Sequence, residues 1–178
     1  QSMGGRICLE TYAHNPDRIA TLTLAGVHAS FGEFTEVQRR EFVERRRKPL
    51  VEDGKTPAEM APALARSLVG PDAAQSVFER VVASVSALHV ASYIKTVEAT
   101  TRFDRSAILG EIAVPTLVIG GEHDSLTPPA MKRELAGRIP GARLEILTGC
   151  GHMANMERPE AFNSVVLEFL RTHRERAR

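Results

Sequence analysis

The chain has 178 residues, enough for one domain or for a core with a small cap. Its composition, 43% hydrophobic and 25% charged, is ordinary for a globular chain, and a net charge of +1 excludes a field strong enough to attract nucleic acid or an anionic membrane. The sequence contains no run of about 18 apolar residues, the length that a membrane-spanning helix needs. The two cysteines, Cys8 and Cys150, are far apart in sequence and predict a reduced, cytoplasmic protein.

The first residues predict a helix followed by a strand. Positions 3–14 contain the apolar residues Ile7, Cys8 and Tyr12 and predict a short helix, which ends at Asn15-Pro16. Residues 19–25, Ile-Ala-Thr-Leu-Thr-Leu-Ala, predict a strand. A helix followed by a strand is half of a parallel βαβ unit, so the pattern indicates an α/β fold.

The middle of the chain predicts helices only, over roughly 35–52, 58–69, 72–86 and 88–101. Pro57 opens the second of these helices, and Gly70-Pro71 separates it from the third. We expect residues 27–105 to form an all-helical cap over an active site, with residues 1–26 and 106–178 as the α/β core.

After residue 105 the alternation of strands and helices resumes. Residues 114–119 form a short, continuously apolar run, which predicts a strand buried on both faces. Residues 128–138 predict a helix, and residues 142–147 predict the third strand. Pro159 opens a last helix with one apolar stripe, whose polar tail, 171–178, we expect to fray. Three strands do not close a parallel core, so we expect an incomplete core whose remaining strands precede residue 1.

A carboxylate and an imidazole follow two of the predicted strands. Asp124 lies in the charged triplet 122–124, which is costly beside a buried strand unless it meets a partner. His152 follows the flexible turn 149–151, which can aim an imidazole back at the edge of the sheet. We interpret Asp124 as a catalytic acid and His152 as a general base. The alternatives are a turn or helix-capping aspartate ahead of Thr127 and a surface histidine.

Ser2 stands where a nucleophile would complete this set. Gly4 fills the second small position of a Gly-x-Ser-x-Gly turn, and Gly5 would let the next helix pack close to the sheet. The backbone N–H of Met3 would be one oxyanion donor, reinforced by the helix N-terminus. Gln1-Ser2-Met3 also matches the residues that remain after an expression tag is cleaved off. In this second interpretation Ser2 comes from the tag and stands where the nucleophile of the protein would be.

Two further expectations concern the remaining groups that could carry chemistry. Cys150 is predicted to be a small packing residue, with a cysteine nucleophile as the weaker alternative. The His, Cys, Asp and Glu residues show no metal-ligand spacing, so no metal is expected.

The chain resembles the α/β-hydrolase superfamily from its nucleophile turn onward, and within it the 3-oxoadipate enol-lactonase and carboxylesterase group. The matching segments are the Met-Gly-Gly that follows Ser2, residues 115–121, the loop around Asp124 and residues 151–162. The resemblance implies hydrolysis of an ester or enol-lactone of a small carboxylic acid through an acyl-serine intermediate, without a cofactor. It assigns Ser2, Asp124 and His152 to the triad and Met3 to the oxyanion hole. It also implies a segment ahead of the nucleophile that supplies the second oxyanion donor.

Two other functions stay open at this stage. Meta-cleavage C–C bond hydrolases share the framework, although they often carry a tryptophan after the catalytic histidine, where this chain has Met153. A non-catalytic module that uses its cap and last strands for binding or dimerisation is the other, because an exposed sheet edge invites pairing. The expected partner is a small ester or lactone, and a second copy of the chain is the partner that a dimerising module would have. Whether this chain is active by itself is left open.

Overall fold

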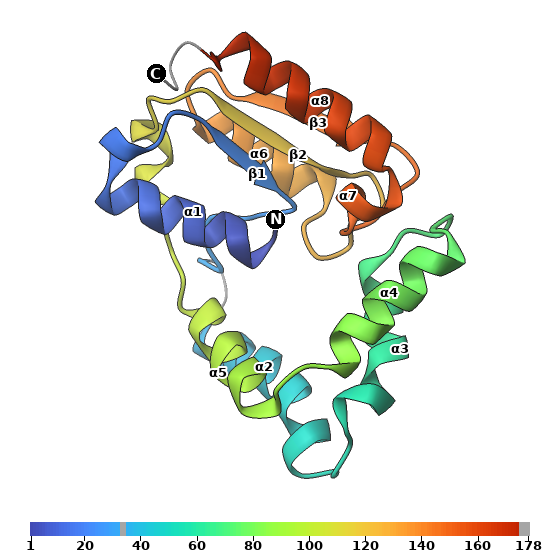
Figure 1. Ribbon diagram of the computed structural model, residues 1–178. Coiled ribbons are helices and arrows are strands. Elements are labelled where there is room, and N and C mark those ends of the chain that lie inside the picture. Colours follow the sequence, from blue (N-terminus) through green and yellow to red (C-terminus); the bar gives the residue numbers. More distant parts are fainter. Residues whose placement is uncertain (33–34, 175–178) are drawn as a thin grey trace. The chain divides into compact units, whose positions relative to one another are not determined.

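The computed structural model describes residues 1–32 and 35–174, which form two compact units (Figure 1). The first unit comprises Gln1–Ala29, Leu68–Ala73 and Arg105–Arg178, and the second comprises Ser30–Ser67 and Ala74–Asp104. The segment 68–73, which the sequence placed inside the helical cap, packs with the first unit.

The first unit is built on a parallel sheet that has three strands in the described residues, in the order β1-β2-β3. The strands are β1 (Leu22–Ala25), β2 (Thr116–Gly121) and β3 (Arg143–Leu147). Every residue of β2 is buried, which confirms the prediction of a strand covered on both faces, whereas β3 is only partly buried. The α/β fold class with a parallel sheet flanked by helices is confirmed.

Three long helices flank this sheet: α1 (Met3–His14), α6 (Pro129–Arg138) and α8 (Pro159–Thr172). Short helical turns lie in the connections: η1 (Pro16–Arg18) between α1 and β1, η2 (Ala107–Glu111) before β2, and α7 (Ala154–Glu157) between β3 and α8. Phe169 of α8 packs against Ala25, Leu117 and Ile119 on one face. Since successive strand residues point to opposite faces, Gly120 points the other way, toward α6. Figure 1 shows α8 and α6 on opposite sides of the sheet.

Gly5 lets α1 approach the end of β1. A Cβ built at Gly5 would lie 2.1 Å from Cγ2 of Val27, whose side chain is fully buried. A larger residue at this position would push the helix away from the strand. The close packing of this glycine, predicted from the sequence, is confirmed.

The second unit is helical in its described residues and contains α2 (Glu36–Val51), α3 (Pro57–Leu68, whose last residue belongs to the first unit), α4 (Gln75–Ser86) and α5 (Val90–Thr101). The four predicted helices are confirmed. Thr35 begins α2 with a capping box, in which its side chain accepts from Gln38 N–H and Gln38 accepts from Thr35 N–H. Within residues 1–32 and 35–174, no single helix is long and apolar enough to cross a membrane. The pair α4 and α5 passes that test only together, with a bend of 100° between them.

Several predicted boundaries shift by a few residues. β1 begins at Leu22, not at residue 19, because its partner β2 begins only at Thr116. α4 begins at Gln75, not at residue 72, because the chain before it is held in the first unit by the N–H of Gly70. The last helix ends at Thr172, and residues 175–178 of the expected fraying tail lie outside the described residues.

The close approach of β2 to the last loop gives a first prediction. A Cβ at Gly121 would lie 2.2 Å from the carbonyl oxygen of Gly151 and 2.3 Å from that of Cys150, and backbone cannot move aside cheaply. We expect Gly121→Ala to lower the free energy of unfolding by about 3 kcal/mol or more. Gly137→Ala is the matched control, because Gly137 is an exposed residue of α6 with open space around it, and alanine there stabilises a helix by about 1 kcal/mol. Urea denaturation measures both, and equal stability of the two variants would contradict the prediction.

Candidate active site

The three residues predicted as a triad lie at one edge of the sheet. Asp124 follows the end of β2, and His152 follows the end of β3. The backbone N–H of Ser2 donates to the carbonyl of Ala25, the last residue of β1, at 2.8 Å. The strands are parallel, so these positions all belong to their carboxyl ends, where open α/β sheets bind ligands.

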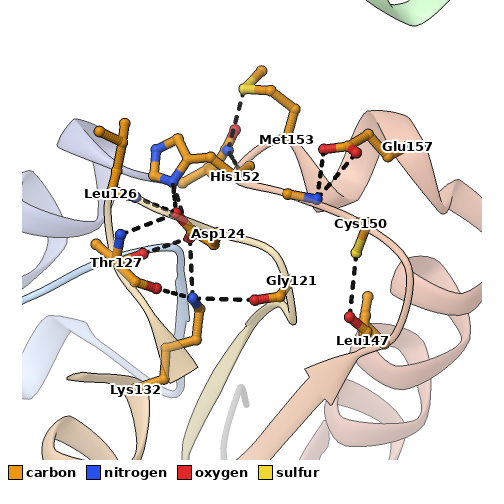
Figure 2. A network of polar contacts seen from close by, with 12 residues as sticks. Gly121, Asp124, Leu126, Thr127, Lys132, Leu147, Cys150, His152, Met153 and Glu157 are labelled. Carbon is orange, nitrogen blue, oxygen red and sulfur yellow. Dashed lines mark hydrogen bonds and ion pairs between the residues drawn. The ribbon is translucent and has the colours of Figure 1, made fainter. Parts of the chain in front are cut away.

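His152 and Asp124 form a buried pair. Nδ1 of His152 lies 3.0 Å from Oδ2 and 3.1 Å from Oδ1 of Asp124, and the two residues are only 5% and 2% exposed. A carboxylate accepts hydrogen bonds, so Nδ1 carries the proton, and in the neutral ring Nε2 is then the acceptor. Figure 2 shows this second ring nitrogen pointing away from Asp124. The pair has the tautomer that a general base requires.

Asp124 is also the centre of its own turn. Oδ1 accepts from the backbone N–H groups of Leu126 at 3.0 Å and Thr127 at 2.9 Å, and Oδ2 accepts from the Thr127 hydroxyl at 2.6 Å. Burial opposes ionisation of this carboxyl, but hydrogen bonds from His152 and Thr127 outweigh it and hold the Asp124 pKa well below its usual range. Asp124 is thus the turn aspartate that one of the sequence interpretations expected, and the same side chain contacts His152. Its role as a catalytic acid stays a prediction.

Lys132 is a functional neighbour that the sequence did not indicate. Its Nζ donates to Oδ2 of Asp124 at 3.0 Å, to the carbonyl oxygen of Gly121 at 3.4 Å and to the carbonyl oxygen of Thr127 (Figure 2). The side chain is completely buried, and burial lowers the pKa of its ammonium group. Lysine is almost never fully buried without a partner, so a helical lysine in a polar stretch predicts a solvated position.

The backbone around His152 is fixed from three sides. Its N–H donates to the carbonyl of Leu68 at 2.8 Å, and its carbonyl accepts from Nε2 of Gln1 at 2.6 Å. Gly26 lies against the imidazole, because a Cβ there would lie 3.1 Å from Cε1 of the ring. Gly26 also has a φ of +57°, which glycine adopts without strain. Gln1, the neighbour of Ser2 in the chain, is thus hydrogen-bonded to His152, the proposed base for Ser2.

Glu157 is a second buried carboxylate that the sequence did not indicate. One of its oxygens accepts from the N–H of Gly70 at 2.7 Å, and both accept from the N–H of Gly151 at 3.0 Å. These bonds satisfy two backbone donors that would otherwise be buried without partners. Glu157 therefore links the segment 68–73 to the loop that carries His152.

Ser2 has the backbone of a strained turn. Its φ of 48° and ψ of −120° make it the one non-glycine residue with positive φ in residues 1–32 and 35–174. It directly precedes α1, whose first residue is Met3, so the positive end of the helix dipole lies at the serine. Sparsely populated backbone conformations cluster at functional sites, and a strained turn into a helix is the geometry of a nucleophile elbow.

Cys150 is buried and packs within the same loop. Its thiol lies 3.4 Å from the carbonyl oxygen of Leu147, and burial raises the pKa of the thiol to about 11. The thiol is therefore protonated near neutral pH and a poor nucleophile. This agrees with a packing role.

The other histidines have structural contacts of their own. His14 pairs with Glu10, His28 with Arg6, His89 caps α5 at Ser92, His123 lies beside Glu122, and the ring of His173 packs on Phe169. In the described residues, no three His, Cys, Asp or Glu side chains gather in a way that could hold a metal ion.

Comparison with known proteins agrees with this geometry. The family model for the alpha/beta hydrolase fold matches residues 1–159, so the chain belongs to the α/β-hydrolase fold family. A 2-hydroxy-6-oxononadienedioate/2-hydroxy-6-oxononatrienedioate hydrolase of Cupriavidus pinatubonensis is 30% identical over 175 residues, which are 95% of this chain and 60% of the relative.

Solved structures give the same picture. An enol-lactonase from Burkholderia xenovorans is 30% identical, with a TM-score of 0.82 over 95% of this chain and 63% of that one. This bears out the resemblance to enol-lactonases. A thermophilic esterase from Thermogutta terrifontis, at 23% identity and a TM-score of 0.85, covers 97% of this chain and 63% of its own and supports the fold alone. The chain spans about three-fifths of the length of these relatives.

The buried carboxylate of Glu157 gives a second prediction. We expect Glu157→Gln to destabilise the protein by about 2 kcal/mol, because both carboxylate oxygens accept from Gly151, so the NH₂ group of the amide would face that N–H, donor against donor. Glu134→Gln, at an exposed position of α6, is the control and should change stability by less than about 0.5 kcal/mol. Thermal and urea unfolding measure both variants, and a neutral Glu157→Gln would contradict the role given to this carboxylate.

The ionisation of Asp124 gives a third prediction, on pH. Its folded pKa is depressed, so the stability it contributes is fully present above the unfolded value of about 3.9 and is lost as the pH falls through the folded value. We expect Asp124→Asn to cost about 3–5 kcal/mol at pH 7, because it leaves the Lys132 ammonium buried without its counter-charge.

The test compares urea denaturation of wild type and Asp124→Asn at pH 7 and at pH 3. The difference in unfolding free energy should shrink at the lower pH, whereas Asp17→Asn, at an exposed position, should show almost no difference at either. A difference that stays constant between the two pH values would contradict the assignment of a depressed pKa to Asp124.

Proposed function

We propose that this chain carries the catalytic residues of a serine hydrolase that cleaves an ester or enol-lactone of a small carboxylic acid. The observation that carries the proposal is the buried pair of His152 Nδ1 and Asp124 Oδ2 at 3.0 Å, at the sheet edge where the strained turn of Ser2 also lies. The core of residues 1–26 and 106–178 and the helical cap of residues 27–105, expected from the sequence, are part of this proposal.

The first half-reaction would form an acyl-serine. Oγ of Ser2 attacks the carbonyl carbon while Nε2 of His152 takes the hydroxyl proton. Asp124 keeps the proton on Nδ1 and stabilises the imidazolium that forms. The negative oxygen of the tetrahedral intermediate would accept from the N–H of Met3 at the positive end of α1. The proton on Nε2 then passes to the leaving alcohol or enol oxygen.

The second half-reaction would release the acid. Water gives a proton to Nε2 of His152 and attacks the acyl carbon, and the returning proton restores the hydroxyl of Ser2. All these steps use side chains and backbone, so the proposed reaction needs no cofactor. An enol-lactone is a suitable substrate because its enol leaving group departs readily, and the likeness to an enol-lactonase at 30% identity supports this choice.

A C–C bond hydrolase of the meta-cleavage type is the second candidate. It is favoured by the likeness to the 2-hydroxy-6-oxononadienedioate hydrolase, which extends over 95% of the chain. The same serine, histidine and aspartate would act there. Met153, in place of the tryptophan often found after the catalytic histidine of such enzymes, favours the ester or enol-lactone reading.

A nucleophile assay tests the proposal. We expect a fluorophosphonate probe to label Ser2, and Ser2→Ala to abolish labelling and to lower the hydrolysis rate by about 10³-fold or more. Ser164→Ala, at an exposed position of α8, is the control and should keep both. The assay uses a p-nitrophenyl ester, an enol-lactone and a 2-hydroxy-6-oxo-dienoate in parallel, so that their relative rates decide between the two candidates.

The same experiment distinguishes the serine hydrolase from a non-catalytic module. The test uses the full-length protein, with the segment ahead of the nucleophile that the resemblance implies. If its serine is not labelled and none of the three substrates is hydrolysed, the serine hydrolase proposal is overturned. A stable dimer in light scattering would then support the non-catalytic module that binds or dimerises.

A further inference from the structure

The ammonium group of Lys132 lies directly behind the proposed catalytic acid. Its Nζ is 3.0 Å from Oδ2 of Asp124, the same oxygen that lies 3.0 Å from Nδ1 of His152. The carboxylate oxygen is thus shared between a lysine and the proposed base. A general base needs only the imidazole and its carboxylate, so the lysine is an addition to the triad.

The surroundings of Nζ fit a charged ammonium group. Its three acceptors are Oδ2 of Asp124, the carbonyl oxygen of Gly121 and the carbonyl oxygen of Thr127. An ammonium group has three N–H donors and no acceptor, so donors and acceptors match one to one. A neutral amine would point its lone pair at one of these oxygens. The site is therefore built for the protonated form.

The aliphatic part of the Lys132 side chain occupies space that a glycine of β2 leaves free. The buried side chain crosses the face of β2 at Gly120, where a Cβ would lie 2.1 Å from Cε of Lys132. Any side chain at residue 120 would collide with this stem. The small residue in the strand and the long residue in α6 thus fit each other, and together they bring a positive charge to a place that solvent does not reach.

A cation at this place changes the balance of charge around His152. An isolated carboxylate favours the imidazolium, because opposite charges within about 4–6 Å stabilise each other. Here the ammonium neutralises Asp124, so protonation of His152 gains less from the carboxylate. Two other titratable groups lie near this cluster in the described residues. They are the protonated thiol of Cys150, two residues before His152, and Glu157 of α7, which accepts from Gly70 and Gly151.

We propose that Lys132 is a positioning residue that neutralises Asp124 and fixes it in its turn, and that its charge weakens the attraction of the carboxylate for a second proton on the ring of His152. The kinetic part of this inference rests on the proposed function. The charge coupling between Lys132, Asp124 and His152 does not.

The test replaces Lys132 by methionine, which keeps most of the stem and removes the charge. We expect the acid limb of the pH dependence of kcat/KM to move to higher pH by about one to two units, because the full charge of Asp124 then favours the imidazolium. Arg133→Met, at the neighbouring exposed position of α6, is the matched control and should leave the limb in place. A role in packing alone would lower activity equally at all pH values.

A measurement without substrate separates this inference from the proposed function. The ¹⁵N-labelled ring of His152, titrated by NMR in wild type and in Lys132→Met, should change protonation state at a higher pH in the variant. If no substrate is turned over but the titration moves, the proposed function fails and the charge coupling stands. A folded variant whose ring titrates as in wild type overturns the inference.

A second readout covers the case in which Lys132→Met does not fold. In wild type, the ¹⁵Nζ signal of Lys132 should show a slowly exchanging ammonium coupled to three protons at neutral pH. Lys132→Gln, which keeps a hydrogen-bond donor without the charge, then replaces the methionine variant in the ring titration. A neutral amine at Lys132, or an unchanged titration in the glutamine variant, overturns the inference.

Discussion

The arrangement of this site depends on one buried carboxylate. Removing Asp124 from water is costly unless nearly every lone pair on its two oxygens finds a donor. Those donors come from three elements: its own turn at Leu126 and Thr127, helix α6 through Lys132, and the loop after β3 through His152. The same requirement therefore fixes the turn, holds the start of α6 against β2 and orients the imidazole.

The loops at this edge are irregular, yet the buried backbone N–H groups of Gly70 and Gly151 have hydrogen-bond acceptors. Gly121 approaches the carbonyls of Cys150 and Gly151 so closely that no side chain fits, and the carboxylate of Glu157 accepts the N–H groups of Gly70 and Gly151. Buried backbone donors without partners would cost free energy comparable to lost hydrogen bonds. A loop held in this way can present a side chain as firmly as a helix does, which is what positioning a base requires.

The elements and the pairing of His152 with Asp124 could be predicted from the sequence, because each is encoded locally. The apolar run before Gly121, the glycine turn before His152 and the charged triplet ending in Asp124 indicate strands that end in functional loops. Lys132 and Glu157 could not be predicted in this way. Their roles arise from residues distant in sequence, and a helical lysine or glutamate in a polar stretch is normally exposed. The start of α4 was missed for the same reason, since Glu157 holds Gly70 from 87 positions away.

The two candidate chemistries share what this edge of the sheet provides. Ester and enol-lactone hydrolysis and cleavage of a carbon–carbon bond both need a neutral imidazole with its proton fixed on Nδ1, and the contact of His152 with Asp124 supplies it in either case. The proposed triad is therefore the same for both reactions. Specificity is a difference in transition-state binding, so it must come from groups that contact the rest of the substrate. In the proposed hydrolase, discrimination between an enol-lactone and a dienoate would for that reason come from the residues around the three proposed catalytic side chains. The pH range of turnover would depend on the charge that Lys132 places behind Asp124.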